Sequence, residues 1–326
     1  MAELSNHLMA TTVLAYLAAM IGYAAEYAFG SRSHIGRAAT RPARQLVGAG
    51  APAAETPPPD DLVVERPRRD VGQIAGWIGV GLNVVGLVLH VGALVTRGVA
   101  ASRMPWGNMY EFILSVTFVG SITWLVVLAR KPAIRHLGLF VTLILVVLLG
   151  AAGLIAYTPV GPLVPALHSY WFIIHVSTII LASGILLLGA VPASMFLIKI
   201  GYDRGRRRFP YTLGKRVPPA AALERLTFRL HAFAFPLFTF GALIAGPLWA
   251  EASWGRYWGW DPKEVWAFIS WVVYACYLHA RATPSVKRTT ATWIALIGFA
   301  TMLMNLFGVN LFFSGLHSYA NAGGMG

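Results

Sequence analysis

The chain has 326 residues, of which 57% are hydrophobic and only 12% are charged. Soluble globular proteins carry about 25% charged residues, so this composition excludes an ordinary soluble domain and indicates an integral membrane protein. The net charge of +13 does not indicate a nucleic-acid-binding protein, because no aromatic–basic RNA- or DNA-binding module accompanies it. The single cysteine, Cys276, excludes an intramolecular disulfide and a thiol relay within this chain.

Apolar runs recur along the whole chain, and several reach the roughly 20 residues that a helix needs to cross a bilayer. They predict an all-α, polytopic membrane protein with about eight transmembrane helices, over residues 8–29, 73–97, 109–129, 135–157, 169–198, 229–249, 263–281 and 291–313. The first run does not have the pattern of a signal peptide, because residues 1–7 contain Glu3 and no Lys or Arg. We therefore expect it to be retained as the first helix.

Basic residues are concentrated in alternate loops. Loops 30–72, 130–135, 199–229 and 280–290 together hold 22 of the 26 Lys and Arg residues. The positive-inside rule places these loops in the cytoplasm, so both termini and the connection between the sixth and seventh helices are expected outside. The excess positive charge is thus a topology signal, with some attraction to anionic lipid of the bilayer.

Three regions are expected from this pattern. Residues 1–29 form the first transmembrane helix. Residues 30–72 are a disordered cytoplasmic linker rich in Pro and Arg, with three consecutive prolines at 57–59. Residues 73–326 form a seven-helix domain with an external Trp-rich loop at 249–264.

Six of the eleven tryptophans lie between Trp249 and Trp271. Rigid aromatic faces beside a few charges suit a flat, apolar ligand with an anionic edge, such as a porphyrin. The alternative is an aromatic belt at the membrane interface, although a belt would spread over many helix ends. The candidate ligand-binding residues of this stretch are Trp254, Arg256, Tyr257, Trp258, Trp260, Asp261, Lys263 and Trp266.

The segment from Asp261 to Glu264 has the pattern of a helix start. Asp261 is the expected N-cap of the seventh helix, Pro262 its first residue, and Glu264 the partner in a capping box. Arg256 and Lys263 could pair with carboxylates of a ligand. Contact with lipid headgroups is the alternative for both, because basic residues near helix ends commonly reach the interface.

Histidines within apolar segments are the second signal, because ionisable groups are costly there. His175 lies near the outer end of the fifth helix and His317 follows the eighth, so the two could flank the Trp-rich loop as ligands of a haem iron. A packed, hydrogen-bonded histidine is the alternative for each. His279 lies near the inner end of the seventh helix and would serve a second, deeper site. The remaining candidates, His90, His168 and His231, are expected to be mainly structural.

The run from Trp254 to Trp266 resembles the Trp-rich WWD signature of haem-handling proteins. Together with His175 and His317 in their local sequences, it makes the chain similar, from about residue 70 to 320, to the CcsA family (ResC, often labelled CcsB in actinobacteria) of system II cytochrome c biogenesis. The resemblance implies a multi-pass protein of the bacterial plasma membrane with the WWD loop on the extracytoplasmic side. With a ResB-type partner, such a protein moves haem b to the outer face and attaches it to the Cys-x-x-Cys-His motif of apocytochrome c.

The same resemblance implies roles for individual residues. His175 and His317 match the outer pair of iron ligands, the Trp-rich loop matches the haem-binding surface, and His279 matches a transmembrane ligand whose companion comes from the partner. The chain would then be part of a holocytochrome c synthase, or haem lyase, with no catalytic side chain assigned. A thioredoxin-like thiol reductant would act only indirectly.

Other functions use similar residues. A cytochrome b-like electron-transfer subunit also has intramembrane histidine ligands, although these form pairs on facing helices. A haem exporter would share the deep histidine and the outer aromatic surface but release haem free. System I haem-handling proteins share the Trp motif, and helix count and partner distinguish them.

Overall fold

The computed structural model describes residues 1–30 and 71–317, and these residues form helices and the loops between them. The predicted linker lies almost entirely in residues 31–70, outside the described part. The long helical segments are α1 (Ala2–Phe29), α3 (Val71–Ala101), α4 (Met109–Arg130), η1–α5 (Pro132–Leu137 and Gly138–Ile155), α6 (Tyr170–Asp203), α7–η4–α8 (Ala220–Thr239, Phe240–Ala245 and Gly246–Trp254), α9 (Pro262–Ala282) and α10–η5–α11 (Arg288–Leu303, Met304–Gly308 and Val309–Phe312). Two short 3-10 helices, η2 (Pro165–Leu167) and η3 (Tyr211–Arg216), lie in connections. The predicted all-α membrane fold is confirmed.

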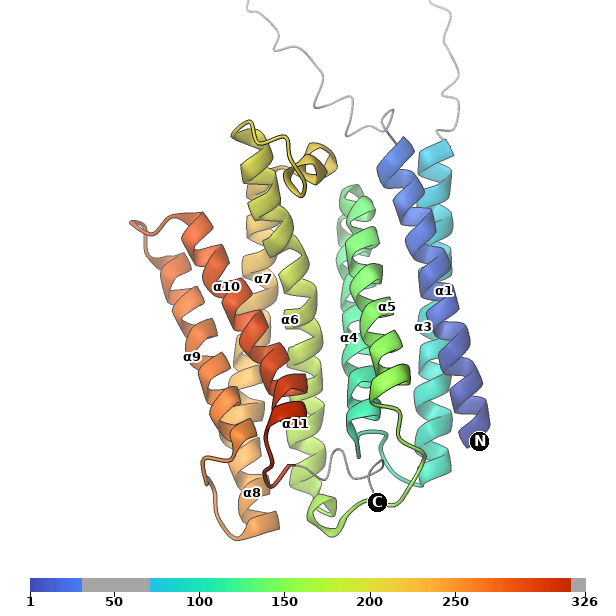
Figure 1. Ribbon diagram of the computed structural model, residues 1–326, viewed down its shortest axis with the longest axis vertical. Helices are drawn as coiled ribbons and strands as arrows, with labels where there is room; N and C mark the ends of the chain where they lie inside the picture. Colours follow the sequence, from blue (N-terminus) through green and yellow to red (C-terminus); the bar gives the residue numbers. More distant parts are fainter. Residues whose placement is uncertain (31–70, 318–326) are drawn as a thin grey trace, which may run out of the picture.

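Seven of the long segments in the described residues are long and apolar enough to cross a membrane. The exception, α9, has 21 residues but contains Trp266, Trp271, Tyr274 and Tyr277, besides charges at both ends. These aromatic and charged side chains lower its hydropathy. It nevertheless packs against α7 and α10 within the same bundle, as Figure 1 illustrates. The eight predicted helices therefore correspond to eight long helical segments in the described chain.

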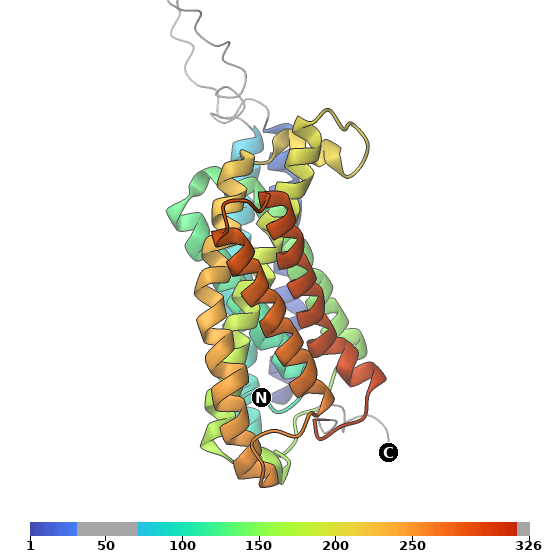
Figure 2. The same ribbon diagram turned by 90° about the vertical axis from the view of Figure 1, so that its left-hand side faces the viewer.

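The helices form one elongated bundle in which α6 is central (Figures 1 and 2). Helix α6 contacts α4 on one side and α7 and α10 on the other, so it joins α1, α3, α4 and α5 to the C-terminal helices. The start of α1, helix α8 and the end of α11 lie at one end of the bundle. The connections α6–α7 and α9–α10 lie at the opposite end, so the basic loops 199–229 and 280–290 share one end, as their alternation predicts.

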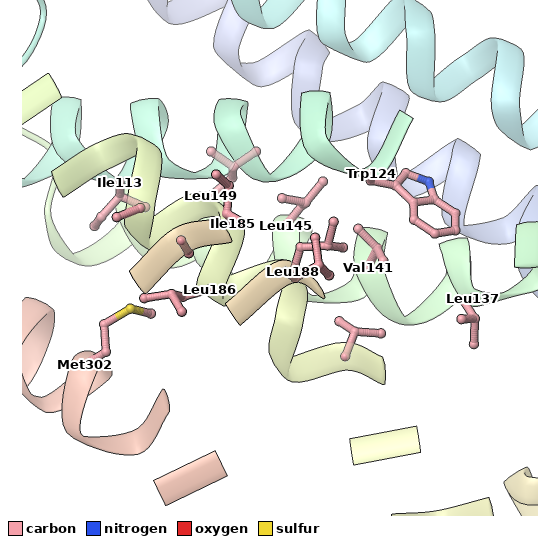
Figure 3. Close-up of a cluster of buried hydrophobic side chains, with 14 of the residues drawn as sticks. Ile113, Trp124, Leu137, Val141, Leu145, Leu149, Ile185, Leu186, Leu188 and Met302 are labelled. Carbon is pink, nitrogen blue, oxygen red and sulfur yellow. The ribbon is translucent and has the colours of Figure 1, made fainter. Parts of the chain in front are cut away.

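Side chains of α4, α5 and α6 meet in the largest apolar core (Figure 3). Trp124 of α4, Leu145 of α5 and Leu186 of α6 are each at most 1% exposed. Close packing of this kind fixes the position of one helix on another. Helix α6 is therefore a rigid support, and the place of His175 in its second turn is set by this core.

Two π-helical turns, η4 and η5, interrupt the segments α7–α8 and α10–α11. π-helical turns are rare in proteins, and those that occur often lie at functional sites. Because the backbone continues through η4, helix α8 extends to Trp254 and ends at Gly255, which adopts a positive φ of 68°. The predicted loop 249–264 is therefore too long: α9 starts at Pro262, and only residues 255–261 connect the two helices.

Candidate functional site

A cavity with an empty volume of about 1080 Å³, partly open to solvent, lies among α4, α6, α7–α8, α9 and α10–α11. Most of its lining is apolar. The titratable residues among the described lining are His175, Tyr257, Lys263, Glu264 and His317. The cavity therefore combines the two predicted imidazoles with part of the Trp-rich loop.

His175 is held by the backbone of the π-helical turn η4. Its Nδ1 lies 2.8 Å from the carbonyl oxygen of Gly241, which also accepts the N–H of Gly246. A carbonyl oxygen can only accept, so Nδ1 carries the proton and the neutral ring has its lone pair on Nε2. A Cβ at Gly246 would lie 3.2 Å from the imidazole, so a glycine there allows the backbone to approach the ring.

His317 is held by Asp261, the N-cap of α9. Its Nδ1 lies 2.7 Å from Oδ2 of Asp261, and the other carboxylate oxygen accepts the N–H of Leu316 at 2.6 Å. Burial alone would raise the pKa of Asp261, but the hydrogen bonds from His317, Leu316 and the N–H of Lys263 outweigh it and hold the pKa below its ordinary value. Burial lowers the pKa of His317 despite the opposing effect of Asp261. A neutral imidazole thus donates from Nδ1 to a carboxylate and carries its lone pair on Nε2.

The two imidazoles meet at one indole. Trp249, which is 2% exposed, stacks on His175 with ring centroids 5.5 Å apart and planes at 14°. The His317 ring meets the same indole edge-on, also at 5.5 Å. The two imidazole centroids therefore lie no further apart than twice that distance. Trp254 packs against both Trp249 and His317, at 4.9 and 5.0 Å.

Only part of the predicted aromatic surface reaches the cavity. Trp254, Tyr257 and Trp258 line it, as does Lys263, whereas Arg256, Trp260 and Trp266 do not. Trp260 is 66% exposed and meets Trp258 edge-on with centroids 5.7 Å apart. The Arg256 guanidinium lies against Gly259, where an added Cβ would come within 2.2 Å of its Cζ. Arg256 and Trp260 therefore belong to the outer rim.

The predicted start of the seventh helix is confirmed. Asp261 accepts the N–H of Lys263, and Glu264 completes the capping box. Oε2 of Glu264 accepts the N–H groups of Gly259 and Asp261 at 2.9 and 3.0 Å. These bonds fix the short connection 255–261 on the end of α9. Asp261 does not line the cavity, but it connects this rigid helix start to His317.

Among the described residues that line the cavity, Lys263 is the one Lys or Arg. Its Nζ lies 3.8 Å from the thioether sulfur of Met109 at the start of α4. An ammonium group beside apolar side chains attracts an anionic partner strongly, because the local dielectric is low. Of the two basic residues predicted to bind a carboxylate, Lys263 lines the cavity and Arg256 does not.

The other histidines lie elsewhere. His279 is exposed on the surface of α9, at the opposite end of that helix from Asp261, and does not line the cavity. His231 is buried, with Nδ1 2.8 Å from the carbonyl oxygen of Thr227, and His90 is fully buried beside Tyr16. Within the described ranges, 1–30 and 71–317, no cluster of three or more His, Cys, Asp or Glu could hold a metal ion.

Several lining residues were not predicted. The segment before α4 contributes Trp106, Gly107 and Asn108, and the deep part of the cavity contains Ser183 of α6 and Asn305 of η5. The Asn108 side chain caps α4, accepting the N–H of Glu111 at 2.9 Å. That capping pattern is visible in the sequence, but nothing in the sequence brings it to the same cavity as the Trp-rich loop.

Comparison with known proteins identifies the family. The cytochrome C assembly protein family matches residues 106–317. The cytochrome c biogenesis protein CcsA of Guillardia theta is 32% identical over 259 residues, which cover 74% of this chain and 85% of that protein. CcsA of Gloeobacter violaceus is 31% identical, covering 74% and 86%, and CcsA of Solanum tuberosum is 32% identical, covering 71% and 81%. The matched region includes the cavity, its two imidazoles and the Trp-rich connection, and the chain belongs to the CcsA family of cytochrome c biogenesis proteins.

Proposed function

We propose that this chain binds haem b in the cavity and presents it for covalent attachment to apocytochrome c, in a complex with a ResB-type partner in the bacterial plasma membrane. One observation carries the proposal. Gly241 and Asp261 each accept a hydrogen bond from Nδ1 of an imidazole, so His175 and His317 both have Nε2 as the ligating nitrogen beside one apolar cavity.

His175 and His317 would hold the iron through Nε2. Metal-binding histidines usually donate their second ring nitrogen to a carboxylate or carbonyl, which fixes the ring and raises its basicity. Both rings have such a partner here. Both imidazoles contact Trp249, so one buried indole fixes the two rings beside the same cavity.

Lys263 and the aromatic lining would orient the porphyrin. The ammonium group suits a propionate of haem b, and Trp254, Tyr257 and Trp258 provide aromatic surface at the cavity. Bound haem supplies the vinyl groups to which the cysteine thiols add. Each addition forms a C–S bond, and the thiol hydrogen goes to the other vinyl carbon, so no oxidant is needed. The residues of this chain hold the reacting edge in place.

A second, deeper haem position would depend on His279. Its exposure on the surface of α9 supports a site completed by a second ligand from the ResB-type partner. The positive-inside pattern supports delivery from the cytoplasmic end, where His279 lies, to the extracytoplasmic end, where the cavity lies. The thiols of the apocytochrome would be kept reduced by a separate thioredoxin-like protein, because Cys276 is the chain's one cysteine.

The test uses the chain purified with and without a ResB-type partner. Wild type should show the absorption spectrum of low-spin, six-coordinate haem, and His175→Ala and His317→Ala should each lose it. His168→Ala is the matched control, because His168 is exposed outside the cavity. An unchanged spectrum in both cavity variants would end the assignment. Co-expression with an apocytochrome c separates the alternatives, because an electron-transfer subunit or an exporter would give no covalent product.

A further inference from the structure

Glu111, in the first turn of α4, is fully buried and accepts hydrogen bonds from three sources. Its Oε1 lies 2.9 Å from Nε of Arg97 and 3.2 Å from Nη2 of Arg103. Its Oε2 lies 2.7 Å from Nη1 of Arg103 and 2.8 Å from the backbone N of Gly107. A single carboxylate therefore joins α3, α4 and the segment between them.

The two arginines extend these contacts to the connection between α5 and α6. Arg97 donates to the carbonyl oxygen of Thr158, and its guanidinium lies 4.6 Å from the ring centroid of Tyr110. Arg103 donates to the carbonyl oxygens of Gly161 and Met104 at 3.1 and 3.0 Å. Glu111 and the two arginines thus connect residues 97–111 to residues 158–161 of the α5–α6 connection.

This ionic cluster lies directly behind one wall of the cavity. Residues 106–109, which we call the α4 wall, line the cavity. The N–H of Gly107 in this wall is bonded to Glu111, and the side chain of Asn108 accepts the N–H of Glu111. Met109 of the same wall contacts Lys263. Most of the wall precedes the first turn of α4, so bonds to Glu111 take the place of regular backbone pairing.

A buried ion pair contributes little net stability, because desolvation of the charges offsets their attraction. Its use here is better explained by the single conformation that it imposes. We propose that Glu111 is a positioning residue for the haem cavity: by holding Gly107 and Arg103, it sets the α4 wall and the approach of Met109 to Lys263. This inference rests on the proposed function and adds to it a residue that does not touch the ligand.

The test compares Glu111→Gln with Glu26→Gln. Glu26 is also a carboxylate paired with an arginine, Arg135, and both side chains are only 10% exposed. This pair joins the last two turns of α1 to η1, whereas α8 and the cavity lie at the end of the bundle where α1 starts. For each purified variant, haem affinity, the midpoint potential of bound haem and the unfolding midpoint are measured. Glu111→Gln should weaken haem binding about tenfold or more and shift the potential, in the range found for outer-shell residues of metal sites. Glu26→Gln should lower stability to a similar extent and leave affinity and potential unchanged.

A second pair of variants keeps every charge in place. A Cβ at Gly107 would lie 2.7 Å from Nη1 of Arg103 and 2.8 Å from Cδ2 of Leu163, so Gly107→Ala should push the Arg103 guanidinium away from Glu111 and the wall. Gly161→Ala is its control, since a Cβ there meets nothing within 4 Å. Gly107→Ala should reproduce the affinity and potential changes of Glu111→Gln, and it decides the question if Glu111→Gln does not fold.

The outcomes are separable. If haem binding requires His175 and His317 but Glu111→Gln and Gly107→Ala behave like their controls, the positioning role is wrong and the proposed function stands. The positioning role is equally wrong if affinity falls only in proportion to stability in all four variants. If wild type binds no haem, or binds it without the two histidines, both proposals fail.

Discussion

Oδ2 of Asp261 lies 2.7 Å from Nδ1 of His317, a residue 56 positions further along the chain. The same carboxylate caps α9 by accepting the N–H of Lys263. One side chain therefore starts the helix that follows the Trp-rich connection and fixes the tautomer of an imidazole at the cavity. The predicted N-cap of α9 thus also orients a candidate iron ligand, although Asp261 itself does not line the cavity.

Asp261→Asn tests this double role. Asparagine caps helices as well as aspartate does, so the helix start and the overall stability should be retained within about 1 kcal/mol. The neutral amide is a weaker acceptor for His317, and haem affinity should fall about 10- to 100-fold, as for other outer-shell partners of metal-binding histidines. Haem titration and thermal unfolding measure the two effects. Asp203→Asn, which alters a surface pair with Lys199, is the control and should change neither.

Lys263→Met should weaken haem binding, because it removes the cation facing the cavity while keeping a side chain of similar length. A hydrogen bond to a charged group contributes about 1.5–3 kcal/mol, which corresponds to about 10- to 100-fold in affinity. The ligand provides the decisive comparison. Wild type should prefer haem over its dimethyl ester, and Lys263→Met should bind both equally.

Arg256→Met is the control for that experiment, because Arg256 is exposed and lies outside the cavity lining. It should keep the wild-type preference for the free acid. Loss of the preference in Arg256→Met, with no loss in Lys263→Met, would reverse the assignment of the two basic residues.

Gly246→Ala should disturb His175 without unfolding the protein. The added Cβ would lie 3.2 Å from Nδ1 and Cε1 of the ring, so the imidazole must move by a few tenths of an ångström. Alanine is favoured over glycine inside a helix by about 1 kcal/mol, so stability should not fall. The midpoint potential of bound haem and its affinity should change. Gly153→Ala on α5, where a Cβ meets nothing within 4 Å, should change neither.

His279→Ala should separate the two haem positions. Because His279 is exposed on α9 and lies at the far end of that helix from the cavity, the spectrum of haem bound in the cavity of the isolated chain should be unchanged. In cells that contain the ResB-type partner, covalent cytochrome c should fall at least tenfold. Normal cytochrome yield in this variant would remove the deep position from the proposed function.

The fold could be predicted largely from hydropathy. Seven of the eight long segments in the described residues are apolar over the length of a bilayer, and α9, which is less apolar, was found from its shorter apolar run and its capping box. Helix ends were less accurate: the predicted sixth run ended at residue 249, whereas α8 continues to Trp254. The cap at Asp261 was predictable because a capping box is a local pattern of four residues.

The site was predicted in part. His175, His317, Trp254, Tyr257, Trp258 and Lys263 were predicted and line the cavity. The contact of both imidazoles with Trp249 and the bond from His317 to Asp261 were not predicted, because each joins residues of separate helices. The α4 wall was missed for the same reason. Local patterns identify which residues bear chemistry, whereas packing decides which of them meet.

The π-helical turn at 240–245 sets a strict length for the chain between α7 and α8. An α-helix turns by about 100° per residue, so deleting one residue from this turn would rotate α8 by roughly that angle. Trp249 and Trp254 would swing away from His175, and the Gly241 carbonyl would return to ordinary helical pairing. Insertions and deletions in these six residues should therefore abolish function even where single substitutions are tolerated. Among related proteins, the length of this turn should vary less than its sequence.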